Sequence, residues 1–133
     1  MLFRSELERF RRETPGAGPV LCWPHHFDMA ALVVLERDAE GEVVRSVGVG
    51  CSPGDAVIDE PYWYVSHSPE SERVDLPHVA VGEWFRDDWT GLLLRGSALV
   101  GAGDAAAQQA RLRAYLAGAF PANRTLALET PLE

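Results

Sequence analysis

Length, composition and charge are those of an ordinary globular domain. The 133 residues are 47% hydrophobic and 24% charged, a normal size and balance for a single domain. The net charge is −8 and all 12 basic residues are arginine. The main arginine cluster alternates with glutamates, so it lacks the basic stripe of a phosphate-binding surface. We therefore expect no nucleic-acid partner. No apolar run approaches the roughly 18 residues of a membrane span, so we also expect no membrane partner and a cytoplasmic location.

The first elements expected along the chain are a short helix and an extended segment. Phe3, Leu7 and Phe10 fall on one stripe at helical spacing. A following stretch rich in proline and glycine ends that helix. Pro24 disfavours helical geometry in the residue before it, so residues 20–23 are expected to be extended.

The next pattern predicts a hairpin. Residues 29–36 are too continuously apolar for a strand with one wet face, so we expect a central strand that is covered on both faces. Residues 38–41 form the turn, and residues 42–51 return as the partner strand. In this return strand Gly48 and Gly50 share one face, and another group is expected to pack closely on their bare backbone.

Two further strands are expected in the second half of the chain. Residues 61–67 alternate, so Tyr62 and Tyr64 point to one face of the sheet and Trp63 points to the other. Residues 84–95 supply a fourth strand, which we place at an edge of the sheet.

A helix is expected to close the chain. Residues 96–103 read as a flexible connection, after which Asp104 is suited to cap a helix near residues 105–119. Its buried stripe at helical spacing is expected to be Leu112, Tyr115, Leu116, Ala119 and Phe120. Pro121 is expected to stop that helix. The predicted fold class is therefore α+β: an antiparallel meander of three to four strands, a C-terminal helix packed on one face and a short N-terminal helix.

Aromatic and polar residues gather in two stretches, residues 23–28 and 52–66. Neither stretch contains a complete catalytic or cofactor motif, so the catalytic residues stay unknown and no cofactor is expected. A pocket formed where the stretches meet would suit a ligand, since pockets are mostly apolar with a few polar groups. The candidate ligand-binding residues are Trp23, His25, His26, Asp28, Asp59, Glu60, Tyr62 and Tyr64.

Two interpretations of Asp28 remain open. His26 and Asp28 share one face of an extended segment, and with Asp59 or Glu60 they would form a minimal site for a divalent metal. Alternatively, Asp28 accepts hydrogen bonds from backbone N–H groups at the turn into the strand, and the aromatic residues fill the core.

The same stretches carry a resemblance. The chain resembles the C-terminal half of a bacterial domain-of-unknown-function family over residues 20–120, through Trp23-x-x-x-Phe27-Asp28-Met29-Ala30, Ser52-Pro53-Gly54-Asp55, Pro61-Tyr62-Trp63-Tyr64 and Ser68-Pro69. The resemblance implies an aromatic strand, an edge strand and a closing helix within a parent about twice as long. It implies no activity.

The leading functional hypothesis is a small-ligand-binding or structural half of a larger two-lobed protein. Its partner would be a missing N-terminal half or a second copy, because a strand that is apolar on both faces needs more cover than one long helix gives. Residues 1–5 back-translate to the end of a common sequencing adapter, so we hypothesise that they are an artefact and that residues 1–133 are one α+β domain of a longer protein. The alternative hypothesis is a metal-dependent enzyme with a His/carboxylate site.

Overall fold

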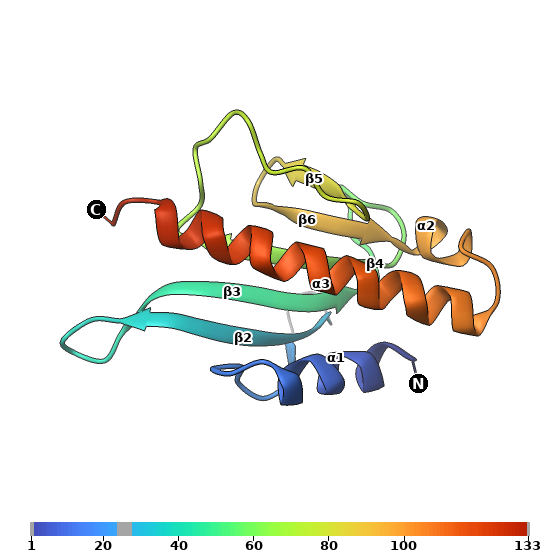
Figure 1. Ribbon diagram of the computed structural model, residues 1–133, viewed down its shortest axis with the longest axis horizontal. Coiled ribbons are helices and arrows are strands. Elements are labelled where there is room, and N and C mark those ends of the chain that lie inside the picture. The colour runs from blue at the N-terminus through green and yellow to red at the C-terminus, as the bar shows by residue number, and fades with distance from the viewer. Residues whose placement is uncertain (1, 24–27, 133) are drawn as a thin grey trace.

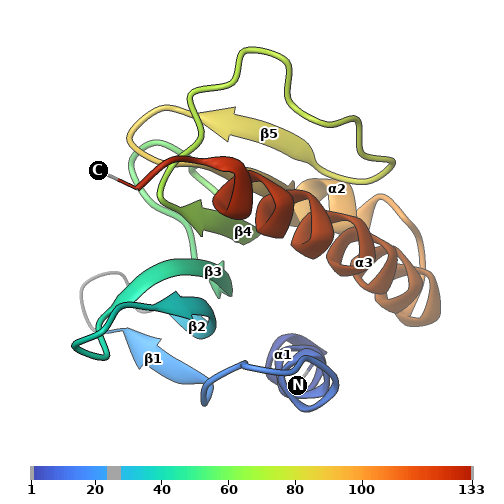
Figure 2. The same ribbon diagram turned by 60° about the vertical axis from the view of Figure 1, so that its left-hand side comes forward.

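The computed structural model describes residues 2–23 and 28–132. The helices are α1 (Leu2–Glu13), α2 (Gly96–Val100) and α3 (Ala105–Glu129), and the strands are β1 (Leu21–Trp23), β2 (Asp28–Arg37), β3 (Val43–Ser52), β4 (Tyr62–Ser68), β5 (Glu83–Arg86) and β6 (Thr90–Arg95). In the described part of the chain the strands form one sheet in the order β1-β2-β3-β4-β6-β5, and every neighbouring pair is antiparallel (Figure 1 for β2 to β6, Figure 2 for β1). The predicted α+β class, with helices at both ends of the chain, is confirmed.

Both α1 and α3 lie on the same face of the sheet (Figure 2). Helix α3 crosses β3, β4 and β6, while α1 lies along β2 and β3. The core between them contains Trp63, the largest fully buried side chain, and the predicted stripe of α3 is buried except for a partly exposed Phe120. The Tyr115 hydroxyl donates to the Leu92 carbonyl over 2.5 Å, which ties α3 to β6 inside this core.

A buried glutamate joins the two helices on this face. The Glu6 carboxylate accepts hydrogen bonds from Gln109 (2.7 Å) and Arg113 (3.0 Å) on α3, and from Arg9 (3.0 Å) on its own helix. Burial acts to raise the Glu6 pKa, but the hydrogen bonds from Arg113, Arg9 and Gln109 outweigh it and lower the pKa. The charged form of Glu6 is therefore the one that the fold stabilises.

Helix α3 continues past Pro121 to Glu129, so the predicted stop is wrong. Pro121 lies on the exposed side of the helix, where a carbonyl left without its N–H partner can bind water. Beyond it, Asn123 and Leu126 are fully buried against the sheet, which outweighs the local cost of the proline. Arg45 closes the far end by donating to the carbonyls of Ala127 and Thr130.

The buried part of this extension contacts a histidine of β4. His67 Nδ1 lies 2.8 Å from the Asn123 side-chain oxygen, and His67 Nε2 accepts from the Ser71 backbone N–H over 3.0 Å. This pair of contacts fits the neutral imidazole with its proton on Nδ1. Burial lowers the His67 pKa, and it outweighs the opposing effect of the Asn123 hydrogen bond.

Two other predictions for the second half of the chain are wrong. Residues 84–95 do not form one edge strand: Asp87 and Asp88 turn the chain, and β5 is the edge while β6 lies between β5 and β4. Residues 96–103 contain α2, whose Leu99 is buried in the core. The predicted Asp104 cap is confirmed, since its side chain accepts from the Ala107 N–H over 2.9 Å.

Strand β2 differs from the central, doubly covered strand that the sequence suggested. It lies next to the short outer strand β1, and its second face has no helix over it in the described structure (Figure 2). On that face the Leu32 side chain is 41% exposed.

None of the described helices combines the length and the apolar composition that a membrane span requires.

Candidate functional site

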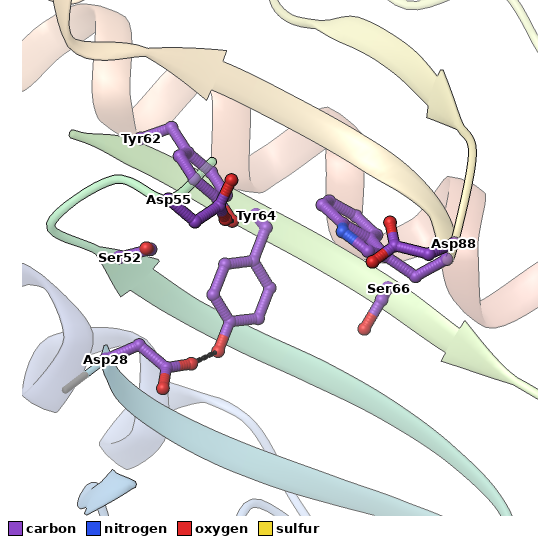
Figure 3. A pocket seen from close by; sticks show the side chains of 8 residues that line it. Asp28, Ser52, Asp55, Tyr62, Tyr64, Ser66 and Asp88 are labelled. Carbon is purple, nitrogen blue, oxygen red and sulfur yellow. Dashed lines mark hydrogen bonds between the residues drawn. The ribbon is translucent and has the colours of Figure 1, made fainter. Parts of the chain in front are cut away.

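A pocket of about 220 Å³ lies on the face of the sheet opposite to α1 and α3 (Figure 3). Its residues come from β2, the end of β3, the loop after β3, β4 and the turn between β5 and β6. Most of them are either aromatic or acidic, and the others are serines. The lining residues are Asp28, Ser52, Asp55, Tyr62, Tyr64, Ser66, Asp88 and Trp89.

Two glycines leave room for aromatic side chains to pack against the sheet backbone. A Cβ built on Gly50 would lie 2.6 Å from the Tyr64 hydroxyl, so the end of that side chain rests on bare backbone of β3. A Cβ on Gly91 would lie 2.7 Å from the Trp89 ring. The sequence predicted close packing on the glycine face of β3, and Tyr64 is the group that packs there.

Tyr64 crosses β3 to reach β2. Its hydroxyl donates a hydrogen bond to Asp28 Oδ2 (Figure 3). Burial, followed by this bond to the carboxylate, raises the Tyr64 pKa well above its ordinary value, so the hydroxyl stays protonated as a donor. The other carboxylate oxygen, Asp28 Oδ1, is buried and has no hydrogen-bond partner among residues 2–23 and 28–132. The predicted role of Asp28 as acceptor from backbone N–H groups is therefore not what the described contacts show.

A second tyrosine–aspartate pair fixes the loop after β3. The Tyr62 hydroxyl donates to Asp55 Oδ2 over 2.7 Å, and Asp55 Oδ1 accepts from the backbone N–H groups of Val57 (2.9 Å) and Ile58 (2.8 Å). Burial, followed by the bond to Asp55, raises the pKa of Tyr62 to about 12. Ile58 is fully buried against Tyr62 and Leu93, so the loop is held over the sheet by both polar and apolar contacts.

The aromatic rings form a continuous wall. Ring centroids are 6.1 Å apart for Tyr62 and Tyr64, 5.9 Å for Tyr64 and Trp89, and 4.7 Å for Trp89 and Phe85. These separations are typical of tilted and edge-to-face aromatic pairs, which hold one another in place.

No family model, curated protein or solved structure matches the chain. The resemblance to a bacterial domain-of-unknown-function family therefore stays a prediction. The interpretation of the pocket rests on its own chemistry.

The structure brings three of the eight predicted site residues to the pocket: Asp28, Tyr62 and Tyr64. Trp23 ends β1 opposite Asp28 in the strand register. His25 and His26 lie outside the described residues, so the predicted metal site of His26 and Asp28 stays a prediction.

The two predicted acidic partners do not line the pocket. Asp59 is exposed on the loop before β4. Glu60 accepts the Ser97 backbone N–H over 2.7 Å at the start of α2. That backbone hydrogen bond is the main cause of its lowered pKa. Glu60 therefore acts as a helix cap.

Five lining residues were not among the predicted candidates: Ser52, Asp55, Ser66, Asp88 and Trp89. Ser66 had a signal, because alternation along β4 places it on the same face as Tyr62 and Tyr64. No pattern in the sequence marked Asp88 and Trp89 as site residues, because they reach the pocket through the pairing of β4 with β6.

The described lining residues do not supply the groups of a hydrolytic triad or of a metal site. None of the eight lining residues is a histidine, a cysteine or a basic residue. His67 points to the helical face of the sheet, on the opposite side from the pocket. Within the described residues no group of three or more His, Cys, Asp or Glu side chains is arranged to hold a metal ion. The available chemistry is aromatic contact and hydrogen bonding to carboxylate and hydroxyl oxygens.

Proposed function

We propose that the protein is a ligand-binding domain and that the pocket on the open sheet face receives a small molecule. The observation that carries this proposal is the tyrosine pair: Tyr62 and Tyr64 are each held by a carboxylate, at Asp55 and Asp28. Side chains that are already fixed lose little conformational freedom when a ligand binds. Concave sites with aromatic walls and a few placed polar groups are typical of small-molecule binding.

An NMR titration with a mixture of small fragments tests the proposal. Trp89 lines the pocket, so its indole N–H signal should shift on saturation, while the signal of the core residue Trp63 should not. The variant Ser66→Phe fills the pocket and should abolish the shift. Ser68→Phe places the same ring two residues further along the same face of β4, at an exposed position outside the lining, and serves as the matched control. If no fragment shifts the Trp89 signal, or if Ser66→Phe leaves binding unchanged, the proposal fails.

A covering partner is a second proposal, and Leu32 is the observation that favours it. This apolar side chain is 41% exposed on the same face as the pocket. A missing N-terminal half or a second copy of the chain would cover it. Size-exclusion chromatography with light scattering tests the second copy. A stable monomer that binds no hydrophobic reporter dye would argue against either partner.

A further inference from the structure

The charged side chains among the described lining residues all have one sign. Asp28, Asp55 and Asp88 contribute three carboxyl groups, and none of the described lining residues is basic. Both tyrosine hydroxyls donate to these carboxylates and stay protonated, so neither supplies a charge of its own. An anionic ligand would be repelled at short range, whereas a cation would be attracted. The described charges therefore favour a cationic ligand over an anionic one.

Asp28 adds an argument of its own. Its Oδ1 atom is buried and, within the part of the chain that the structure describes, accepts no hydrogen bond. A buried carboxylate oxygen without a partner costs free energy. A positive charge bound beside Asp28 would offset that cost, which a neutral ligand of the same shape would not.

The aromatic wall distinguishes an organic cation from a metal ion. Both oxygens of Asp55 already accept hydrogen bonds, so this residue contributes its charge rather than a free ligand atom. Tyr62, Tyr64 and Trp89 offer ring surfaces, and a cation within about 6 Å of an aromatic ring centre is attracted by the ring. This combination of ring surface and carboxylate suits an ammonium or guanidinium group with an apolar body.

We propose that the ligand is a small organic cation, a quaternary ammonium, amine or guanidinium compound that lies against the rings of Tyr64 and Trp89 beside Asp28 and Asp88. This inference rests on the proposed ligand-binding function and deepens it. The volume of about 220 Å³ is below the roughly 300–1,000 Å³ of sites for drug-sized molecules, so the ligand is small.

Choline chloride is the first probe. The comparison is its neutral isostere 3,3-dimethylbutan-1-ol, in which a tert-butyl group replaces the trimethylammonium group. Guanidinium chloride and arginine amide test the other cationic head groups. The carboxylate 3,3-dimethylbutanoate, which also carries a tert-butyl group, tests an anion. In an NMR titration followed at the Trp89 indole, at least one cation should bind saturably. For choline, the isostere should bind about tenfold more weakly, because it keeps the shape and loses the cation–π and carboxylate attraction. The anion should not bind.

Charge-neutral variants locate the effect. Asp28→Asn keeps an acceptor for the Tyr64 hydroxyl and should weaken cation binding by about tenfold, while the exposed Asp88→Asn should weaken it about threefold. Asp59→Asn removes the same charge from a neighbouring loop outside the pocket and should leave binding unchanged. Circular dichroism confirms that each variant is folded, and Asp88→Asn keeps the test intact should Asp28→Asn unfold.

The possible failures are distinguishable. If the neutral isostere binds in the pocket as tightly as choline, or if only anions and neutral fragments bind there, the cation inference is overturned while the ligand-binding proposal stands. If a lysine or arginine peptide binds but free cations do not, the small-molecule inference is overturned. If nothing shifts the Trp89 signal, both proposals fail.

Discussion

The hydrogen bond between Tyr64 and Asp28 gives a quantitative test of how the pocket is built. Tyr64→Phe removes the donor and leaves the Asp28 carboxylate, one oxygen of which is already without a partner in the described structure. Hydrogen bonds to charged groups contribute about 1.5–3 kcal/mol, so we expect Tyr64→Phe to lower the free energy of unfolding by about 2–3 kcal/mol. Asp28→Ala should cost less, about 1–2 kcal/mol, because it leaves a neutral hydroxyl unpaired rather than a charge.

A double-mutant cycle measured by urea denaturation isolates the bond. The double variant should be about as stable as Asp28→Ala, which corresponds to a coupling of about 2–3 kcal/mol between the two side chains. The matched cycle of Asp28→Ala with Tyr62→Phe should give a coupling of less than about 0.5 kcal/mol, because Tyr62 donates to Asp55. A coupling below about 0.5 kcal/mol for Tyr64 would refute the reasoning and would favour backbone hydrogen bonds as the role of Asp28.

Three further changes test the fold by chemical denaturation. Gly50→Ala should lower the free energy of unfolding by about 2–4 kcal/mol, because the added Cβ would lie 2.6 Å from a backbone carbonyl oxygen and from a tyrosine hydroxyl. The control is Gly118→Ala in α3, where a Cβ meets nothing within 4 Å, and this variant should raise the free energy of unfolding by about 0.5–1 kcal/mol. Equal effects of the two substitutions would contradict the close packing at Gly50. His67 has a lowered pKa, so its stabilisation should be complete above about pH 6.5 and be lost as the pH falls through the folded-state pKa. His67→Gln should flatten this dependence and the exposed His78→Gln should not; an unchanged profile in His67→Gln would count against a buried neutral imidazole. Asn123→Ala should cost about 2–3 kcal/mol, because it leaves a buried imidazole N–H unpaired, whereas a helix that ended at Pro121 would show almost no loss.

Patterns of short range in the sequence predicted the elements well. Alternation along β4 correctly separated Tyr62 and Tyr64 from Trp63, because successive side chains of a strand point to opposite faces. The Asp104 cap and the buried stripe of α3 followed equally from local chemistry. The α+β class could be predicted because each of these patterns describes one face of one element.

Long-range packing decided the predictions that failed. Pro121 reads as a stop, yet the helix continues because Leu126 and Ala127 beyond it are both fully buried, and their combined burial offsets the cost of a proline on an exposed helical face. The paired aspartates at 87 and 88 were a readable turn signal, but the apolar residues on both sides made residues 84–95 resemble one strand. The position of β6 beside β4 follows from tertiary pairing, which local patterns do not specify.

The candidate site was predictable only in part, for the same reason. Asp28 and Tyr64 were both candidates, but their contact requires β2 and β4 to lie on the two sides of β3, with Gly50 between them. Glu60 was a candidate by its proximity in sequence, and a helix that the sequence did not predict uses it as a cap. Composition indicated two stretches, and pairing within the sheet brings three of their eight candidate residues to the pocket.

The hydrogen bond from Tyr64 to Asp28 also makes the formation of the pocket depend on the register in which β2, β3 and β4 pair. A shift of β2 by one residue along β3 would turn Asp28 to the helical face and bring Met29 to the open face, where it offers Tyr64 no acceptor of comparable strength. The two side chains can meet only after β3 has paired correctly with both of its neighbours. We therefore expect the pocket wall to close late in folding, so that the ability to bind a ligand marks chains in which this half of the sheet has assembled in its native register.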